Sequence, residues 1–346
     1  MGIGGDLIWT GVVRGVSDKD GRPVVVCKKP KFTDLVFGRL FNGYESLSEN
    51  LIFKENPYLI FLPPVSKRKP RLFTVIDRFF DLVFSHSYFK KKYETYVFKK
   101  SQGLADEGCN RLIHLDMLIH SYAISQTGNR MIWKAGGHAI QVIAKNFQVE
   151  INAPSPEMYF SSDELNFSSF FLSSRILGSS YVVIEPGTNI DWFGDLRAWP
   201  LDRWQDLVFF INKKYPDVSV LQIGLSTTTL LQGVIDLRGK TSFREAALII
   251  KDSLLFVGTE GGLMHAAAAV KARAIILWGG VTLPSFAGYP HLHKIISNSV
   301  PCAPCGQLGW CDNDKVCMNS IRVEVVQSEL ARMLSEKINR VDLYEK

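Results

Sequence analysis

The stretch Val257-Gly-Thr-Glu-Gly-Gly-Leu-Met-His-Ala-Ala-Ala-Ala269 decides the fold class of this chain. It continues the apolar run LLFVG at 254–258, which predicts a buried strand, and it leads into a small-residue helix predicted at 263–270. A strand, a glycine turn and a helix in this order are typical of the carboxyl edge of a parallel sheet, where α/β proteins bind ligands. The free N–H groups of the first helical turn suit a phosphate or diphosphate, although two glycines also fit a plain tight turn.

The segments on both sides of this stretch repeat the alternation of strand and helix. Three further runs are apolar throughout and predict central strands of a parallel sheet: YVVIE at 181–185, VSVLQI at 218–223 and AIILW at 274–278. Pro200 opens a predicted helix, and the capping box Ser242-Phe-Arg-Glu245 opens another. We therefore expect an α/β, Rossmann-like domain over residues 176–325, followed by a terminal helix over 326–346.

The first half of the chain carries a weaker version of the same pattern. Strands are predicted at 23–27, 58–62 and 111–115, so we expect a second Rossmann-like domain over residues 1–175. A helical stripe of apolar residues with basic ends runs over 71–89. This stripe fits a helix lying in a membrane interface, and it fits a core helix with solvated ends equally well.

Length, composition and charge limit the classes of protein to which this chain can belong. The chain has 346 residues, 46% of them hydrophobic and 21% charged, which fits two globular domains and excludes a disordered or disulfide-scaffold chain. We expect no transmembrane helix, no signal peptide and a cytoplasmic protein. Residues 1–175 hold 23 Lys and Arg against 17 Asp and Glu, so the net charge of +6 lies entirely there. This excess predicts either an anionic partner or a solvated basic face.

Two other segments supply candidate functional groups. Glu185-Pro-Gly-Thr-Asn189 and Asp195-Leu-Arg-Ala-Trp-Pro200 follow the first strand of the second domain, so Arg197 could clamp a phosphate or remain a surface arginine. In Gly2-Ile-Gly-Gly-Asp6-Leu-Ile-Trp-Thr10 a glycine-rich loop is expected to place Asp6 before a helix. Asp6 is either a general base or the N-cap of that helix. No GxGxxG or GxxxxGK[ST] motif is present, which argues against NAD binding and ATP hydrolysis.

These elements in this order resemble glycosyltransferase family 9, the heptosyltransferases of bacterial lipopolysaccharide synthesis. The resemblance is strongest over residues 181–325, and it rests on the runs DLRGKTS, FVGTEGGLMHAAAA, AIILWGG, PCAPC and CM. The amino-terminal GIGGDLIWTGVVR is similar to the family's GxGD motif more loosely. Over residues 20–175 only scattered similarity remains.

The resemblance implies a GT-B architecture, in which two Rossmann-like domains face each other across a cleft. It implies an inverting transfer of heptose or a related hexose from a nucleotide sugar, most readily an ADP-sugar, to an anionic glycan or lipid-linked acceptor, with no metal required for catalysis. Asp6 matches the family's proposed general base. The positions that match donor contacts are Thr188, Arg197, Glu260, Gly261, Gly262, Leu263 and His265.

The chain also departs from the family pattern. Glu260 and Gly261 replace the usual Asp-Ser/Thr pair, and Arg197 stands where the heptosyltransferases usually carry Lys. An apolar first strand ordinarily precedes the GxGD loop, whereas here the loop follows Met1 directly, so we expect that strand to be missing or to lie upstream.

Four cysteines form a further group, Cys302-x2-Cys305-x5-Cys311-x5-Cys317. The first pair has the spacing of zinc ligands, so the group predicts either a structural zinc site, reduced thiols with packing roles, or a redox pair. The polar residues Arg130, Lys134 and His138 are weaker candidates for acceptor binding.

The functional expectation is a glycosyltransferase acting at the inner face of the cell membrane as a peripheral protein. The alternatives are a non-catalytic glycan-binding protein and a nucleotide-sugar epimerase or hydrolase on the same fold. Nucleic-acid binding is not expected, because the basic runs lack the aromatic spacing of a stacking surface.

Overall fold

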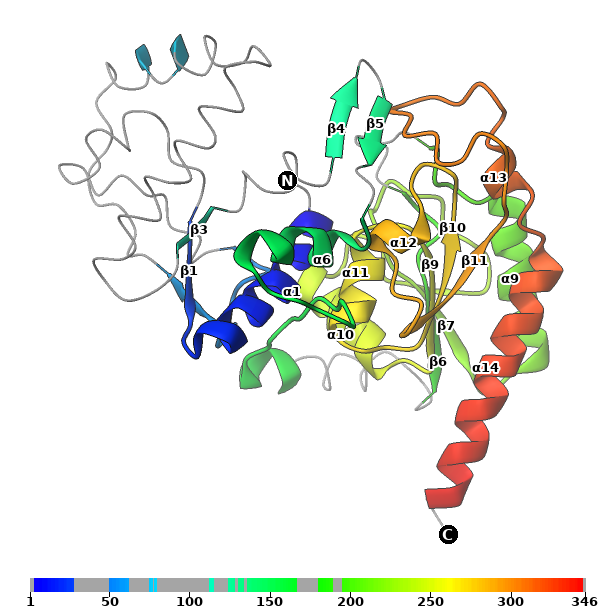
Figure 1. Cartoon of the computed structure of the whole chain (residues 1–346). Coiled ribbons are helices and arrows are strands. Elements are labelled where there is room, and N and C mark those ends of the chain that lie inside the picture. Colours follow the sequence, from blue (N-terminus) through cyan, green and yellow to red (C-terminus); the bar gives the residue numbers. More distant parts are fainter. Residues whose placement is uncertain are drawn as a thin grey trace.

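A computed structural model of the chain shows two α/β units that pack side by side (Figure 1). The residues that the structure describes are 3–27, 50–61, 75–76, 78–79, 112–114, 124–127, 130–133, 136–166, 180–188 and 195–344. Most of the predicted stripe at 71–89 lies outside them, and so do three segments of the first half that are rich in Lys and Arg, at 28–31, 67–71 and 90–92. Within the described ranges, no helix combines the length and the apolar character needed to cross a membrane.

The carboxy-terminal unit contains a six-stranded parallel sheet. Its strands are β6 (Tyr181–Ile184), β7 (Ser219–Gln222), β8 (Ile235–Asp236), β9 (Leu255–Thr259), β10 (Ala274–Trp278) and β11 (His293–Ser297). Their order in the sheet is β11-β10-β9-β6-β7-β8. Counted within the unit this is the order of a Rossmann sheet, in which the strand order reverses between β6 and β9. The four predicted strands are confirmed, and β8 and β11 are additions that the sequence patterns did not reveal.

Alternate residues of each central strand pack on opposite faces of this sheet. Val182 and Ile184 lie in one core with helices α9 (Leu201–Lys214) and α14 (Val323–Tyr344), whereas Val183 lies in the other core with α10 (Phe243–Asp252) and α11 (Gly262–Ala269). Because successive side chains of a strand point to opposite faces, a strand covered on both sides must be apolar throughout. Figure 1 shows the resulting layers, with α9 and α14 on one side of the sheet and α10 and α11 on the other.

The helices predicted for the carboxy-terminal unit are present. In α10 the Ser242 hydroxyl accepts from the Glu245 amide while the Glu245 carboxylate accepts from the Ser242 amide, so the predicted capping box is present. Helix α9 follows Pro200 as predicted, and it buries one face made of Trp204, Leu207, Val208 and Ile211. Helix α14 buries Val326, Leu330, Met333 and Leu334 against the same core, so it packs onto the carboxy-terminal unit.

The amino-terminal unit has a smaller parallel sheet in the order β2-β1-β3, formed by β1 (Val24–Cys27), β2 (Leu59–Phe61) and β3 (Leu112–His114). These are the three strands predicted for this half. An antiparallel hairpin, β4 (Ile124–Thr127) and β5 (Arg130–Trp133), follows, and α6 (Ala139–Ala144) leads into a single 3-10 turn, η3 (Lys145–Phe147).

The amino-terminal segment differs from its prediction. Helix α1 spans Ile3–Asp20, so the residues expected to form a glycine-rich loop are already helical and Asp6 lies in the first turn. Asp6 is therefore not the N-cap of a helix beginning near Leu7. The reason is tertiary packing: α1 lies between α6 and α11, and Leu7, Trp9, Val12, Val13 and Val16 are fully buried.

Glycines let α1 approach its neighbours closely. A Cβ on Gly4 would lie 2.8 Å from Cδ2 of His265 in α11, and a Cβ on Gly11 would lie 2.4 Å from the Ser155 carbonyl oxygen. Only glycine fits at such distances. Residues of α1, α10 and α11 consequently share one hydrophobic core that joins the two units.

Candidate functional site

The candidate site lies at the point where the strand order of the large sheet reverses. Ligands of open α/β sheets bind outside the carboxyl ends of the strands at this point, here β6 and β9. The segment after β6 contains Glu185 and Thr188, and the segment after β9 contains Glu260 and the start of α11. The Glu185 amide donates to the Val257 carbonyl at 3.0 Å, which holds the two strand ends together. Both segments that the sequence singled out therefore lie at one edge.

Helix α11 begins with its backbone amides at this edge. Gly261 is its N-cap in a fully extended conformation, and no side chain of the described residues caps the helix. Leu263, His265 and the four alanines that follow are all buried, so the helix is held firmly against the sheet. Eight residues of aligned peptide dipoles and the free amides of the first turn form a suitable site for an anionic oxygen.

A buried ion pair lies beside the helix start. Nη2 of Arg197 is 3.2 Å from Oε1 of Glu260, which also accepts a hydrogen bond from the Thr282 hydroxyl at 2.8 Å. The second carboxylate oxygen of Glu260, Oε2, is buried and has no hydrogen-bond partner among the described residues. Burial lowers the pKa of Arg197 and the charge of Glu260 opposes that shift. An unmatched buried carboxylate oxygen is costly, so it is a position at which a ligand hydroxyl would be stabilised.

The two edges of the His265 ring contact different elements. Its Nδ1 lies 2.7 Å from the hydroxyl of Tyr289, which is fully buried after helix α12 (Pro284–Ala287). The other edge of the ring lies against Gly4 of α1. Burial, followed by the charges of His138, Arg197 and His293, lowers the pKa of His265 to about 3, so the imidazole is neutral at physiological pH.

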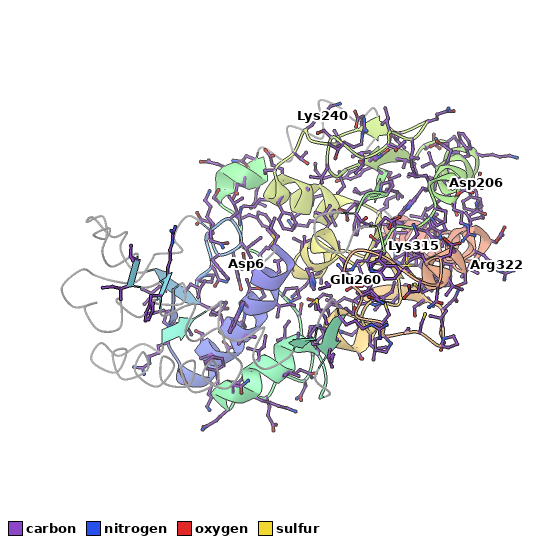
Figure 2. The ribbon with its side chains drawn as sticks, turned by 90° about the horizontal axis from the view of Figure 1, so that it is seen from above. Asp6, Asp206, Lys240, Glu260, Lys315 and Arg322 are labelled. Atoms are coloured by element: carbon purple, nitrogen blue, oxygen red, sulfur yellow. The ribbon has the colours of Figure 1, made fainter. Side chains whose placement is uncertain are left out.

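Asp6 reaches the same region from the other unit. Its Oδ2 accepts a hydrogen bond from Nδ2 of Asn50 at 3.2 Å, and it lies one turn or less from the Gly4 contact with His265. Figure 2 shows Asp6 on α1 and Glu260 ahead of α11, on neighbouring elements in the middle of the molecule. Helices α1 and α11, which carry or follow these two residues, are in contact.

Glu185 is a further acid at this edge. Its carboxyl group follows β6 directly, and burial raises its pKa to about 8. At neutral pH most of this group is therefore protonated and able to donate a hydrogen bond.

Of the three candidates for acceptor binding, only Arg130 and His138 lie within the described residues. Arg130 is exposed at the start of β5, Lys134 lies outside the described residues, and His138 is 3% exposed. Nδ1 of His138 accepts from the Ile140 amide and caps α6, and burial lowers its pKa to about 4. His138 is thus occupied with holding a helix start, and its ring packs on Tyr289 at 5.1 Å between centroids.

The four clustered cysteines line one cavity of about 190 Å³ that also includes Arg130, Gln307 and Asp312. No three His, Cys, Asp or Glu side chains in the described ranges are arranged so that they could hold a metal ion. Sγ of Cys311 accepts from the amides of Asn313 and Lys315, and burial together with the other three thiols raises the pKa of Cys305. This arrangement does not fit the zinc site predicted from the spacing, because a zinc ligand must be a thiolate aimed at a common point.

Sequence patterns missed several residues of the site. Asn50, Thr282 and Tyr289 lie in irregular segments without a motif, and each is brought to the site by tertiary packing. Thr282 lies shortly after the glycine pair that follows β10. This glycine pair indicates the end of a strand, and it is the one sequence pattern that could have pointed to Thr282.

Comparisons with known proteins give the family and the fold of the chain. The family described as glycosyltransferase family 9 (heptosyltransferase) matches residues 103–309. Among solved structures, the glycosyl transferase family 9 protein of Veillonella parvula is similar with a TM-score of 0.61 and 13% identity, covering 97% of this chain and 95% of that one. The ADP-heptose LPS heptosyltransferase II of E. coli gives a TM-score of 0.53 and 14% identity, covering 96% and 95%. A search of curated proteins finds no match.

These likenesses extend over nearly the whole chain and give it the fold of those structures, the GT-B fold of two α/β units with parallel sheets. The family match covers more than half of the residues and includes the start of α11. The chain is a glycosyltransferase that belongs to glycosyltransferase family 9.

Proposed function

We propose that the protein transfers a heptose or a related hexose from a nucleoside-diphosphate sugar to an acceptor on lipopolysaccharide or another surface glycan. The observation that carries the proposal is the contact between Gly4 of α1 and His265 of α11. This contact brings the turn of α1 that contains Asp6 next to the start of α11, whose free amides would bind an anion. An ADP-sugar is the first donor to test, because the E. coli neighbour is an ADP-heptose enzyme.

The donor would lie at the carboxyl ends of β6 and β9. Its diphosphate would accept hydrogen bonds from the amides of Gly262 and Leu263, with Thr188 and Arg197 alongside. Glu260 would accept a hydroxyl of the donor at its unpartnered oxygen, Oε2. Because Arg197 is already paired with Glu260, binding there would couple recognition of the sugar to recognition of the phosphate.

The acceptor hydroxyl would approach from the side of α1. Asp6 would remove its proton as the hydroxyl oxygen attacks the anomeric carbon, while the bond to the diphosphate breaks on the opposite face. This direct displacement inverts the anomeric configuration. Negative charge that develops on the leaving diphosphate would be stabilised by Arg197 and the α11 amides, which do not have to reorganise during the reaction. We therefore propose a reaction that does not depend on a metal ion.

We propose that residues 1–175 bind the acceptor and residues 176–325 the donor. The net positive charge of residues 1–175 supports an anionic acceptor and a peripheral contact with the membrane surface, since phosphate groups would be attracted to it.

A transfer assay tests the proposal. The purified protein is incubated with ADP-, GDP-, UDP- or dTDP-sugars, with and without a truncated lipopolysaccharide acceptor, and the released nucleotide and the product anomer are measured. We expect release with one nucleotide, only when acceptor is present, an inverted product and no effect of a chelator. Consumption of the donor without acceptor would indicate a hydrolase or epimerase instead. Binding of acceptor with no turnover of any donor would indicate a glycan-binding protein.

A further inference from the structure

Tyr289 forms a hydrogen-bonded pair with His265 that the proposed chemistry does not use. The Tyr289 side chain is fully buried, and three imidazoles surround it, with ring centroids at 5.6 Å for His265, 5.1 Å for His138 and 6.0 Å for His293. Among these, the Nδ1 of His265 makes the hydrogen bond with the Tyr289 hydroxyl, at 2.7 Å. No other side-chain hydrogen bond of Tyr289 is found in the described part of the chain.

The direction of this hydrogen bond follows from the groups available. A neutral imidazole has one protonated and one unprotonated nitrogen, and a phenol has a single proton to donate. If Nδ1 carried the proton and donated it to Tyr289, the buried phenolic O–H would have no acceptor among the described residues. If Tyr289 donates to Nδ1, the phenol is satisfied and the imidazole proton is on Nε2. A buried donor without an acceptor is strongly disfavoured, so the second arrangement is preferred.

The consequence lies at the opposite edge of the ring. Nε2 would lie 3.2 Å from a Cβ built on Gly4, which directs it toward the junction of α1 and α11. It makes no hydrogen bond with the residues that the structure describes. A neutral imidazole with its proton on Nε2 therefore presents a hydrogen-bond donor at the start of α11.

We propose that Tyr289 is a positioning residue that holds His265 in the Nε2–H tautomer, so that His265 donates a hydrogen bond to the diphosphate of the nucleotide sugar. The part that concerns the diphosphate rests on the function proposed above, whereas the part that concerns the tautomer does not. The neutral state of the ring is consistent with its low pKa, which burial causes. The phenol also stays protonated, because burial raises the pKa of Tyr289.

The test uses the full chain labelled with ¹⁵N-histidine. Long-range proton–nitrogen correlation spectra distinguish the two tautomers, and a His265→Gln variant assigns the signals among the seven histidines. We expect the Nε2–H form in the wild type and an increase of the Nδ1–H form in Tyr289→Phe. Tyr181→Phe is the matched control, because it removes another buried hydroxyl of the same unit, bonded to the Ile249 carbonyl at 2.9 Å, and should leave the His265 signals unchanged.

The kinetic arm uses the donor that the transfer assay identifies. Tyr289→Phe should weaken kcat/KM for the donor by about two- to tenfold, as expected for one lost hydrogen bond, with KM for the acceptor unchanged. Tyr181→Phe should leave both values unchanged. An Nδ1–H tautomer in the wild type, or no change of tautomer in Tyr289→Phe, would overturn the inference, as would a changed tautomer with unchanged donor kinetics. If no nucleotide sugar is turned over by the wild type, the proposed function fails and the spectra still decide the role of Tyr289.

Discussion

Asp6 is the carboxylate on which the proposed chemistry depends, and its position in a helical turn gives it a defined orientation. Asn50 donates to one of its oxygens, and Gly4 brings the turn into contact with α11. These contacts place the Asp6 carboxyl group at the junction of the two units.

Asp6→Asn should reduce kcat by about 10² to 10⁴-fold, the usual contribution of a general base. Donor binding should change little, because the acceptor and not the donor would meet this group. Asp18→Asn is the control on the same helix, since Asp18 is exposed and pairs with Arg14. Equal activity of the wild type and Asp6→Asn in the transfer assay would remove Asp6 from the mechanism.

Glu185 gives a prediction about pH and stability. Its pKa is raised from 4.5 to about 8 by burial. Between these values the folded protein holds a proton that the unfolded chain releases, so rising pH favours unfolding. We expect the stability of the wild type, relative to Glu185→Gln, to fall from pH 5 to pH 8. Denaturant unfolding at several pH values measures the difference in the free energy of unfolding between the two proteins. A difference that does not change between pH 5 and pH 8 would contradict the burial of Glu185 in its protonated form.

At the scale of elements, the contact of α1 with α11 depends on glycine. In Gly4→Ala the new Cβ would meet the His265 ring, which must move together with the start of α1. We expect a loss of kcat of about tenfold or more and a smaller loss of Tm than in Gly11→Ala, because the His265 side chain can shift whereas a backbone carbonyl cannot. Gly11→Ala is the contrast. Its Cβ would meet the fixed Ser155 carbonyl, so it should lower stability by about 1–3 kcal/mol.

A buried arginine holds α10 to the segments that cross from the first unit. Arg244 is 4% exposed, and it donates to both oxygens of Glu164 and to the carbonyls of Leu51 and Tyr159. Hydrogen bonds from Arg244 are the largest cause of the lowered pKa of Glu164, about 2. This pair therefore contributes stability above pH 4.5 that is lost as the pH falls toward 2.

Arg244→Met should destabilise the protein by about 3 kcal/mol near neutral pH, because it removes the charged donor that the Glu164 carboxylate shares with two carbonyls. The deficit relative to the wild type should shrink as the pH is lowered from 4.5 toward 2. Arg332→Met is the control, because the exposed Arg332 pairs with Glu329 at the surface, and it should leave stability nearly unchanged. A constant deficit across this pH range would show that Arg244 acts through packing alone.

Sequence patterns predicted the elements whose signals are local. The apolar runs became β6, β7, β9 and β10, and the capping box at Ser242 became the start of α10. The same reasoning failed at Asp6, because the helix that contains it is stabilised by burial against α6 and α11 and not by its own glycine-rich sequence. The spacing of the cysteines predicted proximity correctly but not metal geometry, which depends on where each sulfur points. Tyr289 could not have been predicted, since its role exists only through its contact with His265.

At the scale of the whole molecule, the two units meet through a continuous core that includes α1, α10 and α11. The proposed donor groups belong to the carboxy-terminal sheet, and Asp6 belongs to the amino-terminal unit. Because the proposed groups lie on different units, sugar transfer should require both units. Donor binding should depend mainly on residues at the carboxyl ends of β6 and β9, where the strand order reverses. The central claim is therefore that a nucleotide sugar binds at this point through Arg197 and the start of α11.

The most direct test is a thermal-shift titration with ADP-, GDP-, UDP- and dTDP-sugars on the wild type, Arg197→Ala and Lys213→Ala. A ligand that binds only the folded state raises Tm by an amount that grows with the logarithm of its concentration divided by Kd. Lys213 is the control, because it is an exposed cation at the end of α9. We predict that one nucleotide, ADP first, raises Tm in the wild type and in Lys213→Ala, and that Arg197→Ala loses most of this shift. The absence of a shift with every nucleotide, or an equal shift in Arg197→Ala, would contradict the account.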